Sequence, residues 1–198
     1  MFEPKTFDHL IGTAGFSETL LKNHFTLYQG YVTNTNKLAD TLAALLREGT
    51  TATPEYAELK RRFGWEYNGM RLHELYFANM NKAPELTPVV GDFKAVVEKS
   101  FGSEDAWLKD FKASGTMRGI GWVLLMLDPI EKRLFNIWVN EHDLGHLAGC
   151  SPLLVLDVFE HAYMLDYGLK KADYLEAFLR AVDWQVVSAR FNAAMRNV

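Results

Sequence analysis

Three histidines and one aspartate have the residue types and the positions that a metal site requires. Asp157 and His161 stand four residues apart, directly after an apolar run at 152–156 that predicts a short buried strand. His24 and His73 each lie on the apolar stripe of a predicted long helix. A buried carboxylate needs a partner, and carboxylate oxygen and neutral imidazole bind the same metal ions. The four side chains together predict a buried mononuclear site with room for a solvent molecule or a small substrate.

The same residues allow a purely structural interpretation. An aspartate at a helix start caps that helix, and a histidine on an apolar face is usually a hydrogen-bonded core residue. Spacing alone does not prove that the side chains converge. Two histidines on facing helices, together with an Asp–His pair after a strand, nevertheless favour the metal site over a structural role.

Two long helices must position the first two histidines. Ser17 is a candidate N-cap for the first helix, whose apolar residues recur at three- and four-residue spacing until Gly49 ends it. Pro54 suits the first turn of the second helix, which is predicted to run to about Asn81. Because a short polar loop joins them, we expect an antiparallel helical hairpin.

The rest of the chain predicts a mixed domain beyond a boundary marked by Pro84 and Pro88. The predicted elements are two short helices at 93–101 and 104–112, strands at 119–127, 134–139 and 152–156, and an amphipathic helix from Ala172 to about Asn197. The fold class is α+β: an N-terminal antiparallel helical hairpin domain, residues 1–86, then a C-terminal domain, residues 87–198, with a three-stranded antiparallel sheet flanked by helices. We expect the metal site between the two domains.

Composition excludes several classes of protein. The 198 residues are 48% hydrophobic and 13% aromatic, which is typical of a folded globular chain. The net charge of −4 and the lack of any Lys/Arg block argue against a nucleic-acid partner. Cys150 is the single cysteine, so no intrachain disulfide forms, and a reducing compartment is favoured. With no signal-like start and no membrane-length apolar run, we expect a cytoplasmic protein without a membrane partner.

Seven consecutive residues carry a resemblance to a known family: Asp157-Val158-Phe159-Glu160-His161-Ala162-Tyr163. They resemble the D-x-W-E-H-A-Y motif of the iron/manganese superoxide dismutase family, with Phe159 in place of the usual tryptophan. Further similar segments follow the family's order along nearly the whole chain; they lie at 31–36, 101–111, 119–122, 172–175 and 182–184. The predicted fold is also that of the family.

The resemblance implies a superoxide dismutase that disproportionates superoxide to dioxygen and hydrogen peroxide at one iron or manganese ion per chain. It carries the metal ligands to His73, Asp157 and His161. The first ligand falls on Asn23 if the helices are matched without a gap, and on His24 after a one-residue deletion. We expect His24, because it lies on the apolar stripe and because asparagine is a poor ligand for a redox metal.

The resemblance also implies two catalytic groups beside the metal. Tyr31 would stand at the access channel and order the water that supplies protons. The family's outer-sphere glutamine on the second helix is Gly69 here, so we expect its role from His142, in the loop before the third strand. Such a group adjusts the redox potential of the metal through the bound solvent.

Glu160 resembles the family's interface glutamate, which reaches the ligand histidine of the other subunit. Because such contacts are reciprocal, the resemblance implies a homodimer, or a tetramer that contains it. The family's tyrosine–histidine pair in the access channel is changed, since Met164 replaces the tyrosine and Leu27 or Tyr28 replaces the histidine. Proton delivery would be altered accordingly.

A charge of −4 repels an anion such as superoxide over the whole molecule. A basic rim would therefore have to focus the anion on the site. Arg71 and the pair Lys170-Lys171, which occupies the place of a basic pair in the family, are the candidates.

Two other functions stay open from the sequence. A catalytically inactive relative would keep the fold and bind metal without turnover. A metal-dependent hydrolase would use the same three histidines and aspartate, and its general base would be Glu74 or Glu160.

Overall fold

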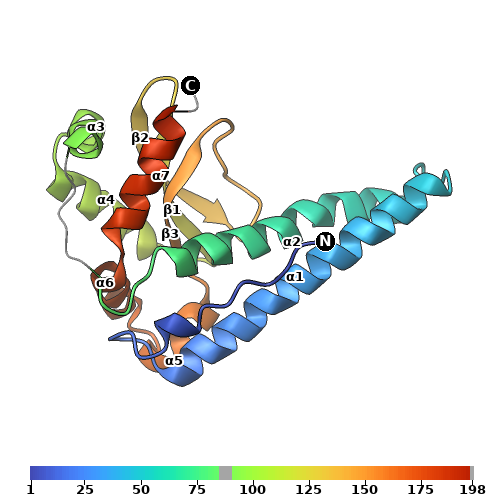
Figure 1. Cartoon of the computed structure of the whole chain (residues 1–198), viewed down its shortest axis with the longest axis horizontal. Coiled ribbons are helices and arrows are strands. Elements are labelled where there is room, and N and C mark those ends of the chain that lie inside the picture. The colour runs from blue at the N-terminus through green and yellow to red at the C-terminus, as the bar shows by residue number, and fades with distance from the viewer. Residues whose placement is uncertain (85–90, 197–198) are drawn as a thin grey trace.

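The computed structural model describes residues 1–84 and 91–196, and its architecture confirms the predicted α+β class. The N-terminal part is an antiparallel hairpin of α1 (Glu18–Arg47) and α2 (Pro54–Ala78). The far half of this hairpin projects as an arm from the rest of the molecule (Figure 1). The boundary predicted between residues 86 and 87, with Pro88, lies outside the described residues.

Both hairpin helices begin where the sequence supplies a cap. Ser17 Oγ accepts a hydrogen bond from Leu20 N at 3.0 Å, and Thr53 Oγ1 accepts one from Tyr56 N at 3.2 Å. Pro54 occupies the first turn of α2, where its missing N–H is no loss. These caps fix the starts of α1 and α2, which then pack against each other along the hairpin.

The segment before α1 is tied to the hairpin and contains a single 3-10 turn, η1 (Asp8–Leu10). Phe2 N donates to Asn36 Oδ1 at 2.7 Å, and Asn36 Nδ2 donates back to Phe2 O at 2.8 Å. Lys5 N donates to Tyr28 Oη at 3.0 Å. The N-terminal segment therefore braces α1 from outside.

One three-stranded antiparallel sheet lies in the described part of the chain, with the strand order β2-β1-β3. The central strand β1 (Gly121–Asp128) is buried over its first seven residues, which explains its continuous apolar sequence. Its neighbours are β2 (Arg133–Asn140) and β3 (Ser151–Asp157). In the β1–β3 register Trp122 stands opposite Asp157, so the end of the sheet presents a carboxylate and an indole together.

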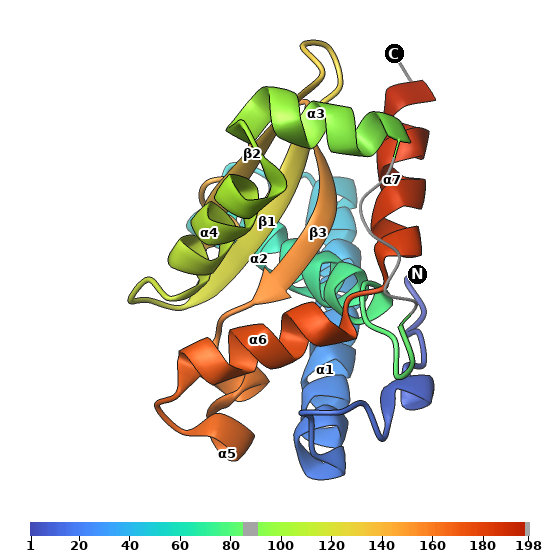
Figure 2. The same cartoon turned by 90° about the vertical axis from the view of Figure 1, so that its left-hand side faces the viewer.

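Helices cover both sides of this sheet. α3 (Gly91–Phe101) and α4 (Glu104–Gly115) contact β2, and α4 also contacts β1. α2 and α7 (Trp184–Arg196) contact β3. Figure 2 shows α3 and α4 in front of the sheet and the hairpin behind it. The chain leaves β3 through η2 (Glu160–Ala162), α5 (Met164–Tyr167) and α6 (Lys171–Ala181).

The prediction of one helix from Ala172 onward is wrong, because the chain breaks between α6 and α7. Val182 is extended there and forms an antiparallel bridge with Met80, just after α2. Asn81 N donates to Ala181 O at 2.8 Å on one side of this bridge. Tertiary pairing with the end of the hairpin thus overrides helical periodicity. The predicted helix end, Asn197, lies outside the described residues.

Within residues 1–84 and 91–196, no helix combines the length with the apolar character needed to cross a bilayer.

Candidate metal centre

Four elements bring His24, His73, Asp157 and His161 into one cluster. His24 comes from α1, His73 from α2, Asp157 from the last position of β3, and His161 from η2. One ligand atom of each residue can be chosen so that all four atoms lie within 4.8 Å of one another. Residues more than a hundred positions apart in the sequence therefore meet at one point.

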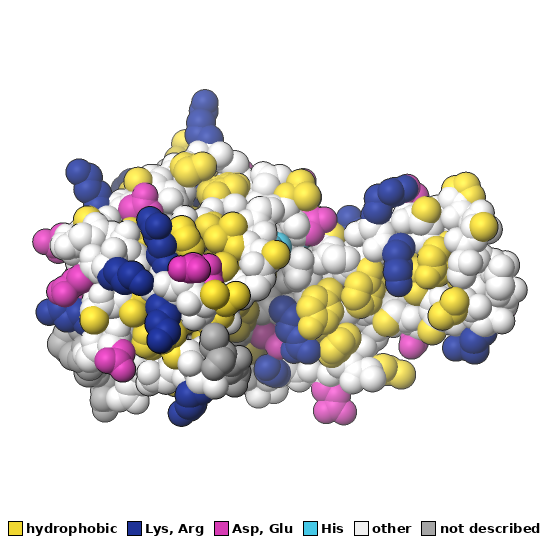
Figure 3. All heavy atoms as spheres, turned by 90° about the horizontal axis from the view of Figure 1, so that it is seen from above, with side chains coloured by type: hydrophobic (Ala, Val, Ile, Leu, Met, Phe, Trp, Pro, Cys, Tyr) yellow, Lys and Arg dark blue, Asp and Glu magenta, His cyan; other side chains and the backbone are white. Residues whose placement is uncertain are grey.

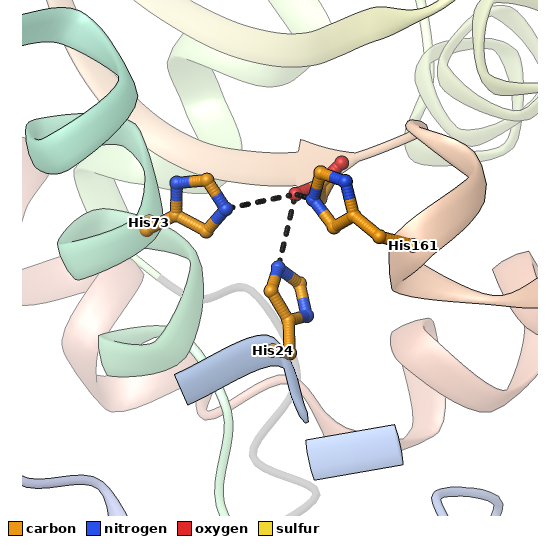
Figure 4. A group of neighbouring side chains, drawn as sticks. His24, His73 and His161 are labelled. Atoms are coloured by element: carbon orange, nitrogen blue, oxygen red, sulfur yellow. Dashed lines mark hydrogen bonds and ion pairs between the residues drawn. The ribbon is translucent and has the colours of Figure 1, made fainter. Parts of the chain in front are cut away.

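The three imidazoles surround a single carboxylate oxygen, Asp157 Oδ2 (Figure 4). The Nε2 atoms of His24 and His161 both lie 3.2 Å from this oxygen, and His73 Nε2 lies 3.6 Å from it. His24, His73 and Asp157 are buried, whereas the His161 side chain is 28% exposed. The site is thus open on the side of His161.

Hydrogen bonds to the backbone orient two of these groups. His73 Nδ1 lies 2.5 Å from Gly69 O, so this nitrogen carries the proton and Nε2 presents its lone pair to the cluster. Asp157 Oδ1 accepts a hydrogen bond from Phe159 N at 2.9 Å, which leaves Oδ2 facing the imidazoles. His73 Nε2 and Asp157 Oδ2 are therefore each held toward the centre of the cluster by a second contact of their own residue.

Two buried nitrogens in the cluster lack a conventional partner. Among the described residues, neither His24 Nε2 nor His73 Nε2 makes a hydrogen bond. An unsatisfied buried polar atom costs about 1–3 kcal/mol, so two of them facing one carboxylate oxygen require an explanation. A metal cation bound by the three nitrogens and the carboxylate removes that cost. The donor set of three imidazoles and one carboxylate suits iron, manganese or zinc.

The charge states also fit metal binding. Burial, the largest effect, lowers the pKa of both His24 and His73 below the ordinary histidine value, so both are neutral imidazoles. Burial alone would raise the pKa of Asp157, but the adjacent His161 and His24 outweigh it and hold that pKa well below its usual range. His24 and His73 thus offer neutral nitrogens and Asp157 offers an ionised carboxylate, which are the ligating forms.

His142 lies beside the cluster in a hydrogen-bonded chain. Trp122 Nε1 donates to His142 Nδ1 at 3.0 Å, and His142 Nε2 lies 2.8 Å from Tyr31 Oη. Burial lowers the pKa of His142 to about 4, so the ring is neutral. Because the indole can only donate, Nδ1 accepts, and the single ring proton is on Nε2, facing Tyr31. The tautomer of His142 is therefore fixed by Trp122.

Aromatic rings enclose the cluster. Tyr31 stacks on His73 with ring centroids 5.1 Å apart, and Trp122 meets the same imidazole edge-on at 4.9 Å. Phe159 stacks between His142 and His161, at 4.8 and 5.2 Å. These rings restrict the volume around Asp157 and limit water there, which strengthens electrostatic interactions.

Gly69 explains how Tyr31 reaches this place. A Cβ atom at position 69 would lie 2.5 Å from the Tyr31 ring, closer than any real contact. The glycine is therefore required for the ring to lie between α2 and His142. No longer side chain fits at position 69 while Tyr31 keeps this position.

Several residues considered from the sequence lie elsewhere. Asn23 is exposed, whereas its neighbour His24 is buried in the cluster. Glu74 is engaged with Lys5 Nζ at 3.0 Å, Arg71 Nη1 at 2.7 Å and Tyr28 Oη at 3.1 Å. A carboxylate with three such partners is a poor general base for a metal-bound water. His146 bonds the backbone oxygen of His142 at 2.9 Å, and His9 lies in η1.

Trp65 is a site residue that sequence reasoning missed. Its ring lies 4.5 Å from the His142 ring and 5.5 Å from the Tyr31 ring. It precedes Gly69 by four residues and His73 by eight on the same helix. That spacing places it on the face of α2 that carries His73, and could have identified it.

Comparisons with known proteins agree over nearly the whole chain. A family model described as iron/manganese superoxide dismutases, C-terminal domain, matches residues 89–190. An iron superoxide dismutase of Cupriavidus metallidurans is 39% identical over 187 residues, or 92% of this chain and 92% of the relative. An iron superoxide dismutase of Aquifex pyrophilus is 36% identical over a region that covers 98% of this chain and 92% of the relative. Manganese superoxide dismutase 2 of Haloferax volcanii is 35% identical over a region that covers 90% of this chain and 87% of the relative.

Proposed function

The chain belongs to the iron/manganese superoxide dismutase family, and we propose on this basis that it disproportionates superoxide to dioxygen and hydrogen peroxide. The observation that carries the proposal is the convergence of three imidazole nitrogens on Asp157 Oδ2 in a buried, aromatic-walled site. A bound iron or manganese ion supplies the one-electron couple that alternately oxidises and reduces superoxide.

His24, His73 and His161 would hold this ion through their Nε2 atoms, and Asp157 through Oδ2. Support comes from the two buried nitrogens that make no hydrogen bond among the described residues, and from the neutral imidazoles that burial favours. We propose one ion per chain, iron or manganese, since relatives named for each metal match over similar shares of the chain.

Tyr31 and His142 would handle protons. Reduction of superoxide to hydrogen peroxide consumes two protons for each pair of superoxide molecules, and they must cross the aromatic wall. The Tyr31 Oη–His142 Nε2 hydrogen bond of 2.8 Å provides a polar path through that wall. Tyr31 also keeps its phenolic proton, because burial is the main cause that raises its pKa.

The site would join two domains, residues 1–86 and 87–198. Two of the proposed ligands, His24 and His73, belong to the first, and Asp157 and His161 belong to the second. Metal binding would then hold the hairpin against the end of the sheet.

We also propose a cytoplasmic homodimer, or a tetramer built from it, with Glu160 at the two-fold interface. Glu160 is exposed beside the partly exposed ligand His161. Nearby Met164, Leu165 and Leu169 are 44%, 58% and 89% exposed, which is unusual for apolar side chains unless a partner covers them.

Reconstitution with different metals tests the proposed function. The purified protein is loaded separately with iron, manganese and zinc, and superoxide dismutation is measured with each. We expect turnover with iron or manganese and none with zinc, which has no redox couple at the site. Binding of all three without turnover would instead favour an inactive metal-binding relative.

A further inference from the structure

A cavity of about 210 Å³ lies beside Tyr31, in the groove between α1 and α2. Besides Tyr31, its walls include Asn34 from α1 and Arg62, Trp65 and Glu66 from α2. Tyr31 connects it to the metal centre, because the same ring stacks on His73 and its hydroxyl bonds His142. A small molecule in this cavity is therefore separated from the proposed ligand His73 by the side chain of Tyr31.

Arg62 is the one cation in the described lining of this cavity, and it is held by two contacts. Its guanidinium carbon lies 3.7 Å from the centroid of the Trp65 ring. Its Nε donates to Glu66 Oε1 at 3.0 Å, and its Nη2 forms an ion pair with the same oxygen at 2.9 Å. Trp65 in turn is anchored by a hydrogen bond of 2.9 Å to Glu141. The positive charge thus has a defined position.

The two charges of the Arg62–Glu66 pair differ in depth. The Arg62 side chain is 51% exposed, whereas the Glu66 side chain is 7% exposed. Arg62 occupies Glu66 Oε1, and within the described residues Glu66 Oε2 has no hydrogen-bond partner. An anion that approaches from solvent therefore meets the arginine first, and the carboxylate lies beneath it.

Other basic residues are less suited to this task. Arg71 is paired with Glu74 at 2.7 Å and lines a different cavity, whose described walls do not include Tyr31. Lys171 donates to Met117 O at 2.8 Å and lies over the Trp138 ring. On the face seen in Figure 3, basic side chains are interspersed with acidic ones, so the charge near each opening decides where an anion is drawn.

We propose that Arg62 attracts the anionic substrate into the cavity beside Tyr31, and that Glu66 limits the strength of this attraction. This inference rests on the proposed function, since it takes superoxide as the anion. In a protein of net charge −4, one exposed arginine at the cavity offsets a general repulsion. Arg62 is then a positioning residue that acts on encounter, without touching the reacting atoms.

The test compares kcat/KM for superoxide in Arg62→Gln, Glu66→Gln and the matched control Arg61→Gln. Arg61 carries the same charge one position away, is 73% exposed, pairs with Glu58 and is absent from the described cavity lining. At low ionic strength, we expect kcat/KM to fall about threefold in Arg62→Gln and to rise in Glu66→Gln, with kcat unchanged. Both changes in kcat/KM should become small at ~0.5 M salt, because the ions screen the charges.

A second measurement does not depend on turnover. Azide, a univalent anion that binds ferric and manganic ions, is titrated spectroscopically into the metal-loaded proteins. We expect its Kd to rise about threefold in Arg62→Gln, to fall in Glu66→Gln and to stay unchanged in Arg61→Gln. If Arg62→Gln and Arg61→Gln behave alike in both assays, the inference is overturned. If azide binding depends on Arg62 while dismutation is absent, the proposed function fails and anion attraction stands.

Discussion

The hydrogen bond between Trp122 and His142 shows how one side chain sets the chemistry of another. Trp122 lies at the start of β1, opposite Asp157 in the sheet register, and its indole fixes the tautomer of His142. His142 can then donate from Nε2 toward Tyr31. The state of the proposed proton path would therefore depend on Trp122, a fully buried residue that bonds His142 on the side away from Tyr31.

Trp122→Phe removes this donor while keeping an aromatic ring. We expect dismutation to fall about tenfold with metal content unchanged, because His142 Nδ1 loses the bond that orients it. The control is Trp107→Phe, which removes a similar 3.0 Å bond to Asn136 away from the site. Each variant should lose about 1–3 kcal/mol of stability, but only Trp122→Phe should lose activity. Equal activities of the two variants would contradict the role given to Trp122.

Gly69 gives a second test at the scale of one residue. In Gly69→Ala the new methyl group would displace the Tyr31 ring, so we expect a loss of about 1–3 kcal/mol and weaker dismutation with metal retained. Gly64→Ala, on the same helix, is the control, since nothing among the described residues lies within 4 Å of its Cβ position. It should gain about 0.5–1 kcal/mol from helix propensity. Urea unfolding and activity assays separate the two outcomes.

At the scale of elements, local sequence signals determined the hairpin and the sheet. Ser17 and Pro54 mark the helix starts, and the apolar run before Asp157 marks β3, so both could be predicted. The break at Val182 could not, because it depends on pairing with Met80 about a hundred residues earlier. Helical periodicity carries no information on such a partner.

The candidate metal site could be predicted from the sequence to a similar extent. The Asp157–His161 pair stands in a distinctive motif, and His73 lies on a clear apolar stripe. Asn23 and His24 are adjacent on one helix and differ by only ~100° in direction, so packing against α2 and β3 decides which points inward. The Trp122–His142 bond depends on how the loop after β2 folds back, which no local pattern encodes.

The N-terminal segment, α1 and α2 meet at Glu74, which makes their packing sensitive to pH. Burial raises the pKa of Glu74, but hydrogen bonds and charges from Lys5 and Arg71 outweigh it, so the net pKa is lowered. A carboxyl group with a lowered folded-state pKa stabilises the fold at neutral pH and loses this effect as the pH falls through that pKa. Glu74 should therefore stabilise the protein above about pH 5 and progressively less below it.

Urea unfolding of the metal-free protein at several pH values checks this expectation. Glu74→Gln should have a lower free energy of unfolding than the unmodified chain at pH ~7. This difference in the free energy of unfolding should become smaller between pH ~5 and ~3. Glu58→Gln, at an exposed ion pair with Arg61, is the control and should show little difference at any pH. If this difference for Glu74→Gln did not change with pH, the ion pairs of Glu74 would not contribute to the stability of the fold.

At the scale of the whole molecule, the proposed metal ties the hairpin to the sheet domain. A ligand that binds only the folded state stabilises that state by about 4 kcal/mol when the free ligand concentration is a thousand times the Kd. Removing the metal by chelation should therefore lower Tm by about 10 °C for a chain of this size. Differential scanning calorimetry of loaded and stripped protein gives the difference, and equal Tm values would show that the site does not join the two domains.

The most direct test of the central claim is metal content and dismutation rate, measured on the same samples of the unmodified protein, His24→Ala and Asn23→Ala. We predict about one iron or manganese ion per chain with fast dismutation in the unmodified protein and in Asn23→Ala, because Asn23 is exposed while its neighbour His24 is buried in the cluster. In His24→Ala both should be lost. Metal and activity retained in His24→Ala, or lost in Asn23→Ala, would contradict the proposed four-residue metal site.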